Sequence, residues 1–218
     1  MAIKPILMNT EMVRAILDGR KICTRRLVRF LPGENPQWTG YIRDGLMLYN
    51  GRNEPCIMKA PYQPGDLLYV RETWGISNMD DESKMAYIVY RASEEQENEG
   101  CREVHLPDEK FEKMYESMAE SEPEWRPSIH MPKEAARIWL KVTGVRVERL
   151  HKITAEDIRN EGLSSMAVHA GDMEIALKEW ETLWNSTIKK SDLDRYGWEA
   201  NSWVWVIEFE RCDKPQEV

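Results

Sequence analysis

The stretch WVWVIEFE, residues 203 to 210, contains the clearest strand pattern of the chain. Large apolar side chains recur at every second position, at Trp203, Trp205, Ile207 and Phe209. Because successive side chains of a strand point to opposite faces, this spacing predicts a strand with one strongly apolar face. We therefore expect these aromatic side chains to pack in the core of a sheet.

The longest strand pattern precedes it, between Ile138 and Leu150. Ile138, Leu140 and Val142 share one face, but the apolar positions after Gly144 continue with odd spacing. One extra residue in a strand shifts the alternation by one position, so the slip predicts a β-bulge at Gly144.

The other predicted elements are shorter, and strand patterns outnumber helical ones. Strands are expected at Lys4–Met8, Leu27–Leu31, Leu67–Val70 and Met85–Arg91, with a hairpin between Tyr41 and Tyr49. Helices are expected at Glu11–Asp18, Asp108–Ala119, after a Thr154 capping box, and along the apolar stripe from Met173 to Trp184. Strands and helices do not alternate as in βαβ units, so we expect an α+β fold, a small mixed β-barrel with flanking helices.

The charge is unevenly distributed along the 218 residues. Twelve acidic and three basic side chains between residues 92 and 124 give this segment a net charge of −9, which leaves +1 for the rest from a total of −8. We interpret residues 1–218 as one domain that carries an acidic, partly helical insertion at about 92–124. The net acidity therefore says little about the rest of the chain, where basic side chains cluster locally.

Composition also limits the compartment and the cofactor. The longest apolar runs have about five residues, far fewer than the ~20 that cross a membrane, and no signal-peptide pattern is present. We expect no membrane partner and a cytoplasmic location. The four cysteines lack paired C-x-x-C spacing, and Cys101 with His105 is a weak metal pair, so neither a metal nor another cofactor is expected.

The stretch GRKICTRR, residues 19 to 26, carries four basic side chains directly after a predicted helix. Gly19 is placed to end that helix, so we expect the next residues to form a turn. In a turn Lys21 and Thr24, three positions apart, can share a face, whereas in a strand they point to opposite faces.

Lys21, Thr24 and Glu72 are candidates for catalysis. The Thr24 hydroxyl can attack an amide carbonyl while a neutral Lys21 takes its proton and Glu72 orients the pair. Alternatively, a cationic Lys21 stabilises the oxyanion while Glu72 activates water. The structural alternative is a helix end with favourable charges and a plain ion pair between Lys21 and Glu72.

The proline-bracketed stretch WRPSIHMP, residues 125 to 132, presents a similar choice. Trp125 can stack on a base while Ser128 and His130 donate hydrogen bonds to a ligand. Alternatively, Trp125 and Ile129 pin a purely structural loop.

Several of these stretches resemble one family. Gly19-x-Lys21 with Arg26 five positions on is similar to the G-x-K-x-x-x-x-R signature of ASCH domains, in the PUA-like superfamily. PGDLLYVRETW, the stretch from WRPSIHMP to residue 162, and NSWVWVIEFE resemble longer ASCH-like proteins of phages and prophages. The acidic segment lies outside the resemblance.

The resemblance implies a PUA-like barrel whose cleft receives RNA or a nucleobase. One ASCH branch consists of N4-acetylcytidine amidohydrolases, and its lysine, threonine and glutamate fall on Lys21, Thr24 and Glu72. Many ASCH members carry glutamate at the position of Thr24, so the threonine favours the amidohydrolase branch. This chain, however, has about twice the length of those enzymes. The candidate ligand-binding residues are Arg20, Arg25, Arg26, Trp74, Trp125, Ser128 and His130.

Three functions follow as hypotheses. The first is hydrolysis of an acylated nucleoside or nucleobase such as N4-acetylcytidine. The second is a non-catalytic module that binds RNA or a modified base, with affinity that falls steeply with salt. The third is an interaction protein that binds a protein partner through its acidic insertion.

Overall fold

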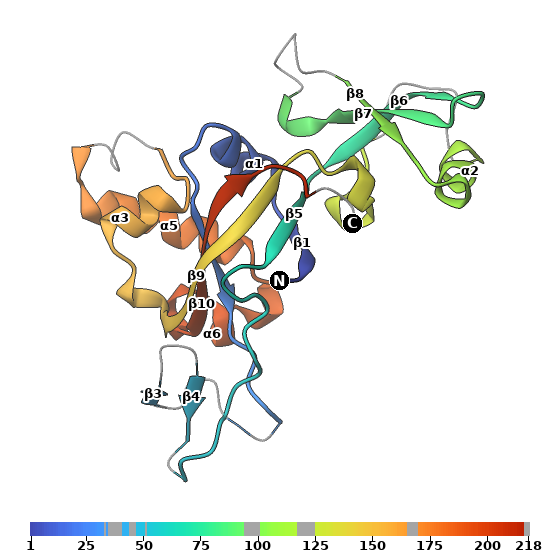
Figure 1. Ribbon diagram of the computed structural model, residues 1–218. Coiled ribbons are helices and arrows are strands. Elements are labelled where there is room, and N and C mark those ends of the chain that lie inside the picture. The colour runs from blue at the N-terminus through green and yellow to red at the C-terminus, as the bar shows by residue number, and fades with distance from the viewer. Residues whose placement is uncertain are drawn as a thin grey trace. The chain divides into compact units, whose positions relative to one another are not determined.

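The computed structural model describes residues 1–32, 34, 41–43, 47–50, 52–93, 101–116, 125–164 and 170–215. Its strands are β1 Ile3–Leu7, β2 Cys23–Leu27, β3 Tyr41–Arg43, β4 Met47–Tyr49, β5 Leu67–Arg71, β6 Trp74–Asp80, β7 Met85–Tyr90, β8 Arg102–His105, β9 Trp139–Arg149 and β10 Trp203–Cys212. Its α-helices are α1 Thr10–Leu17, α2 Asp108–Glu116, α3 Ala155–Asn160, α5 Met173–Ser186 and α6 Leu193–Tyr196 (Figure 1).

These elements form a mixed α+β fold, as the sequence predicts. The strands make a five-stranded sheet in the order β1-β5-β9-β10-β2, a three-stranded sheet β6-β7-β8 and the two-stranded hairpin β3-β4. Among the described strands no closed ring of pairings is present, so a PUA-like barrel stays a prediction. Within these same ranges, no helix combines the length and the apolar character that crossing a membrane requires.

The chain divides into two compact units. Unit 1 comprises Met1–Leu17, Leu67–Leu140 and Arg211–Val218, and unit 2 comprises Asp18–Asp66 and Lys141–Glu210.

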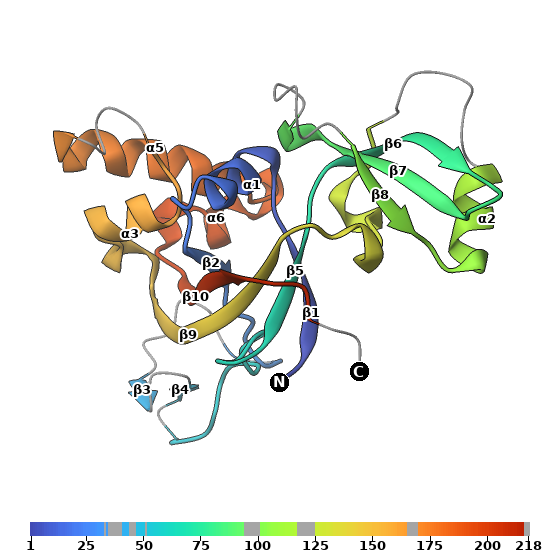
Figure 2. The same cartoon turned by 45° about the horizontal axis from the view of Figure 1, so that its top comes forward.

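Unit 1 contains the parallel pair β1 and β5 and the antiparallel sheet β6-β7-β8. Figure 2 shows α2 beside the sheet β6-β7-β8, and its Phe111 is fully buried in the same core as Trp74 and Ile88. The sequence predicted α2, although its expected end at Ala119 lies outside the described residues. Because β8 pairs with β7, part of the acidic segment 92–124 is an edge strand of this sheet.

Unit 2 is built on β10, which pairs antiparallel with β2 and places Trp205 opposite Arg26 and Ile207 opposite Thr24. One face of these strands packs against α3 and α5, and the buried residues there include Val204, Val206 and the two tryptophans of α5. The predicted capping box is present, since the Thr154 and Asp157 side chains each bond the other's backbone N–H.

The predicted turn in GRKICTRR is wrong. Gly19 does end α1, with a positive φ of 73°, but Cys23–Leu27 is β2 and Lys21 forms a β-bridge with Glu161. The cause is long-range: the β10 backbone continues to pair beyond β2, where the Phe209 N–H donates to the Ile22 carbonyl at 2.9 Å. Lys21 and Thr24 are three positions apart in this extended backbone. Their side chains therefore point to opposite faces.

Candidate functional site

The alternation along β2 divides the basic stretch into two sets of side chains. Lys21 and Arg25 both contact Glu161, which follows α3, whereas Arg26 lines an open pocket together with Trp205. Thr24 occupies the same strand phase as Arg26, but it is buried and is not among the pocket's lining residues. Two neighbouring arginines thus have different environments because they are one position apart in a strand.

Glu161 is the centre of a buried ionic cluster that comprises Lys21, Arg25, Glu148, Asp157 and Glu161. Lys21 Nζ lies 2.7 Å from Glu161 Oε2 and also donates to the Glu161 backbone carbonyl at 3.0 Å. Arg25 donates to Glu161 Oε1 at 3.2 Å and to Glu148 Oε1 at 2.8 Å, and it lies 3.2 Å from Asp157 Oδ1. We call this set the Glu161 cluster.

The surroundings of the Glu161 cluster explain its electrostatics. Burial lowers the pKa of Arg25, but the charges of Glu161, Asp157 and Glu148 outweigh this effect and the net pKa is raised. Burial, assisted by the charge of Glu161, raises the pKa of the neighbouring Cys23 thiol to about 12. The Arg25 side chain is 0% exposed, so it supports the fold and is not accessible to a ligand.

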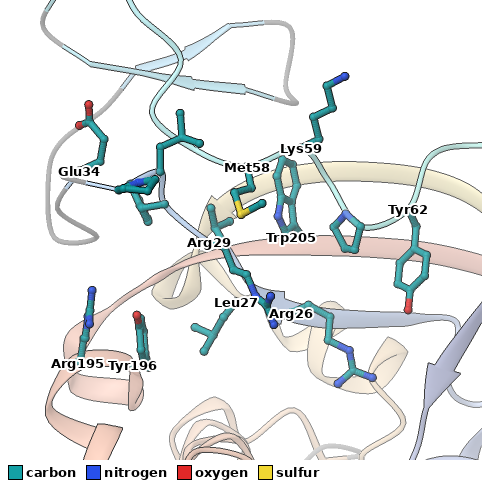
Figure 3. Close-up of a pocket in the computed structure, with 15 residues that line it drawn as sticks. Arg26, Leu27, Arg29, Glu34, Met58, Lys59, Tyr62, Arg195, Tyr196 and Trp205 are labelled. Carbon is teal, nitrogen blue, oxygen red and sulfur yellow. The ribbon is translucent and has the colours of Figure 1, made fainter.

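The open pocket of unit 2 has a volume of about 970 Å³ and lies on the Arg26 side of β2 (Figure 3). Its lining residues are Arg26, Leu27, Val28, Arg29, Phe30, Leu31, Pro32, Glu34, Met58, Lys59, Pro61, Tyr62, Arg195, Tyr196 and Trp205. Four of them are cationic and only Glu34 is acidic, and Glu34 accepts a hydrogen bond from Asn50 Nδ2 at 3.1 Å. The pocket wall is therefore basic.

Backbone pairing brings the distant parts of this wall together. The Met58 N–H donates to the Arg29 carbonyl at 2.8 Å, which carries Lys59 and Tyr62 to the pocket. On another wall, the Trp184 indole N–H donates to the Tyr196 carbonyl at 2.9 Å and fixes the end of α6. The pocket thus rests on the sheet and on α5.

Cationic and aromatic groups are interspersed in this pocket. Figure 3 shows Arg26 and Tyr62 at one end, Arg195 and Tyr196 at the other, and Trp205 between them. Burial raises the pKa of Tyr62, while the nearby positive charge of Arg26 partly offsets the effect. The arrangement suits a ligand that has both negative charge and flat apolar faces.

Glu72, the third predicted catalytic residue, belongs to unit 1 and has a different partner. Arg137 donates two parallel hydrogen bonds to its carboxylate, from Nε and one terminal nitrogen, each at 3.0 Å. The structure therefore pairs Glu72 with Arg137 within unit 1 and Lys21 with Glu161 within unit 2. Trp74 is 1% exposed and belongs to the unit 1 core.

The stretch WRPSIHMP is an ordered loop in unit 1. Ser128–His130 and Lys133–Ala135 are short 3-10 helices, and the loop is anchored by the fully buried Met131. Ile129 is 58% exposed and does not pin the loop as the structural alternative expected. Arg91 lies over the Trp125 ring, 5.1 Å from its centroid.

The predicted site residues thus divide evenly between the units. Unit 1 contains Glu72, Trp74, Trp125, Ser128 and His130, and unit 2 contains Arg20, Lys21, Thr24, Arg25 and Arg26. Arg20 donates to Asp18 and to the Gly162 carbonyl. Of the ten, Arg26 is the one that lines the described unit 2 pocket.

Sequence reasoning missed Glu161, Arg137, Lys59, Tyr62 and Arg195. Glu161 directly precedes Gly162, the predicted end of a short helix, and nothing in its local sequence indicates a buried ion pair. Lys59 and Tyr62 lie in a predicted loop-rich region, where only the pairing of Met58 with Arg29 gives them a role.

No protein-family model matches the chain, and neither does any curated protein or solved structure.

Proposed function

We propose that unit 2 binds single-stranded RNA in the pocket beside Arg26. The observation that carries the proposal is the convergence of four cations and three partly exposed aromatic side chains on one pocket of about 970 Å³. The cations are Arg26, Arg29, Lys59 and Arg195, and the aromatic residues are Phe30, Tyr62 and Tyr196; Trp205, which is 1% exposed, forms part of the pocket wall.

This combination matches the two chemical parts of a single strand. Arg and Lys neutralise phosphates and release counterions, and aromatic faces stack on unpaired bases without demanding one sequence. The pocket lies on one side of β2, whereas the Glu161 cluster keeps Lys21 and Arg25 occupied with carboxylates. Arg26 is therefore the basic residue of GRKICTRR to which we assign ligand contact.

Hydrolysis of an N4-acetylcytidine-like amide, and with it membership of the ASCH family and a PUA-like barrel, stays a prediction. Lys21 would have to leave Glu161 to act as a base, and Glu72 would have to leave Arg137 to assist it. The geometry thus favours binding over this catalytic scheme.

The test is fluorescence anisotropy with a labelled single-stranded RNA of mixed sequence, between about 50 and 200 mM salt. We expect the logarithm of the affinity to fall linearly with the logarithm of the salt concentration, with a slope of about −0.7 for each phosphate contacted. Arg26→Gln should weaken binding about tenfold and reduce the slope by one contact.

Arg52→Gln is the matched control. Arg52 is also in unit 2 and makes an exposed ion pair with Glu54, but it does not line the pocket. If Arg52→Gln weakens RNA binding as much as Arg26→Gln does, binding is a general charge effect and the pocket assignment is wrong. Incubation of the same proteins with N4-acetylcytidine, followed by mass spectrometry for cytidine, tests the hydrolytic alternative.

A further inference from the structure

Unit 1 contains a second, smaller pocket of about 290 Å³ that is unrelated to the unit 2 pocket. Its lining residues are Leu17, Tyr90, Arg102, Arg137, Ile138 and Arg211. Half of this lining is arginine and none of it is acidic. Three elements far apart in sequence supply the arginines: β8, the segment before β9 and the end of β10.

Arg137 is the fixed member of this trio. Its guanidinium donates to both oxygens of Glu72 and to Ser93 Oγ at 2.7 Å, and it lies 4.1 Å from the centroid of the Tyr90 ring. Glu72 and Ser93 are 1% exposed, so the guanidinium is anchored by two buried side chains. Glu72 also neutralises the charge of Arg137.

Arg102 and Arg211 have weaker partners. Arg102 donates to the Ala136 carbonyl at 3.5 Å, and Arg211 donates to the Leu17 carbonyl at 3.4 Å. In the described ranges neither guanidinium forms an ion pair with a carboxylate, whereas Arg137 pairs with Glu72. Among the described residues, the hydrogen bonds of these two guanidinium groups are thus long ones to backbone carbonyls.

The other lining residues bring no carboxylate into the pocket. The Tyr90 hydroxyl donates to the Ala135 carbonyl at 2.6 Å, and Leu17 and Ile138 are apolar. Guanidinium groups bind the oxygens of phosphate in a planar, two-pronged geometry that a chloride ion does not reproduce. The volume of about 290 Å³ is large enough to admit a phosphoryl group.

We propose that this pocket binds a phosphate group through Arg102 and Arg211, with Arg137 as the fixed wall. The group is either free inorganic phosphate or the terminal phosphate of a nucleotide. The proposal goes beyond RNA binding by unit 2, because all six lining residues belong to unit 1.

The test is a titration of the full chain with inorganic phosphate at constant ionic strength, with chloride as the balancing anion. Heteronuclear NMR of the arginine Nε–H groups gives a local readout, assigned through the variants Arg102→Gln and Arg211→Gln. We expect saturable shifts of the Arg102 and Arg211 signals, and an affinity loss of about tenfold in Arg211→Gln.

Arg91→Gln is the matched control, because it removes the same charge from unit 1 outside the pocket. An equal loss in Arg91→Gln, or phosphate shifts that do not saturate or that spare both arginines, would overturn the proposal. Titration with adenosine monophosphate and with adenosine separates the two sources: tighter binding of the nucleotide than of phosphate indicates a phosphate ester, and equal binding indicates the free anion.

Arg26→Gln separates this proposal from RNA binding by unit 2. Its RNA affinity should fall while the phosphate shifts of Arg102 and Arg211 persist. Loss of both in this single variant would show that the two sites are not independent and would overturn the assignment of phosphate to unit 1.

Discussion

Arg25 and Arg26 are neighbours in sequence, but their side chains differ in burial and in the groups that surround them. Arg25 is fully buried among three carboxylates, whereas Arg26 lines a basic, aromatic pocket. The two positions alternate along β2, so one side chain faces the α3 side of the sheet and the other faces the pocket. A basic stretch in a sequence therefore does not have one role, because the strand phase assigns each cation to structure or to ligand.

The substitution Glu161→Gln should destabilise the protein most. The change leaves Lys21 without its carboxylate and removes one of the three around Arg25, so two buried cations lose compensation. Removing one partner of a buried ion pair costs about 3–5 kcal/mol, and we expect that loss in the free energy of unfolding measured with urea. Glu54→Gln, which breaks an exposed pair in the same unit, should cost less than about 1 kcal/mol. Equal costs for the two variants would mean that the Glu161 cluster is not a structural support.

The elements with local patterns were predictable from sequence. The period-two apolar positions of β9 and β10, the capping box of α3 and the stripe of α5 all depend on residues within a few positions of each other. The structure confirms each of them. The β-bulge predicted at Gly144 stays a prediction; a Cβ added there would lie 2.5 Å from Glu208 Oε2, the end of a side chain that can move.

The site was not predictable in the same way, because its contacts are long-range. Lys21 and Glu161 are 140 residues apart, and Glu72 and Arg137 are 65 apart. The charged side chains of β2 also made this strand hard to predict, because a stretch rich in Arg usually indicates a solvated segment. Here the charge of the buried Arg25 is compensated by carboxylates of unit 2. The partner of a buried charge is set by the fold and not by the nearest sequence motif.

The carboxylates Glu72 and Asp157 have opposite pKa shifts. Burial raises the pKa of Glu72, and Arg137 only partly offsets it. Burial also raises the pKa of Asp157, but hydrogen bonds from Thr154 and the charge of Arg25 outweigh this effect. The net pKa of Asp157 is therefore lowered. When the pH falls below the usual pKa of a carboxyl group, Asp157 becomes protonated and loses its stabilising interactions. Glu72, by contrast, takes up a proton more readily in the folded chain than in the unfolded chain.

The expected pH dependence follows from these signs. As pH falls toward the ordinary pKa of Glu72, 4.5, the folded chain takes up the Glu72 proton first, which favours folding. As pH falls further, through the ordinary Asp157 pKa of 3.8 and then its lowered folded value, the contribution of Asp157 is lost. Urea titrations at several pH values should show that Glu72→Gln removes the first effect and Asp157→Asn removes the second. The same pH slope in both variants would contradict the assignment.

A substitution outside the Glu161 cluster, at Gly144, should cost least, because the side chain it meets is that of Glu208. Gly144→Ala places a methyl group against the Glu208 carboxylate, whose side chain is 47% exposed and can swing away. That movement breaks the contact with Arg146, an ion pair worth about 1 kcal/mol or less at this exposure. Urea unfolding should therefore show a loss well below that of Glu161→Gln, and Glu208→Gln in the Gly144→Ala background should add little to it. A loss as large as that of Glu161→Gln would mean that the close approach at Gly144 is set by backbone rather than by this carboxylate.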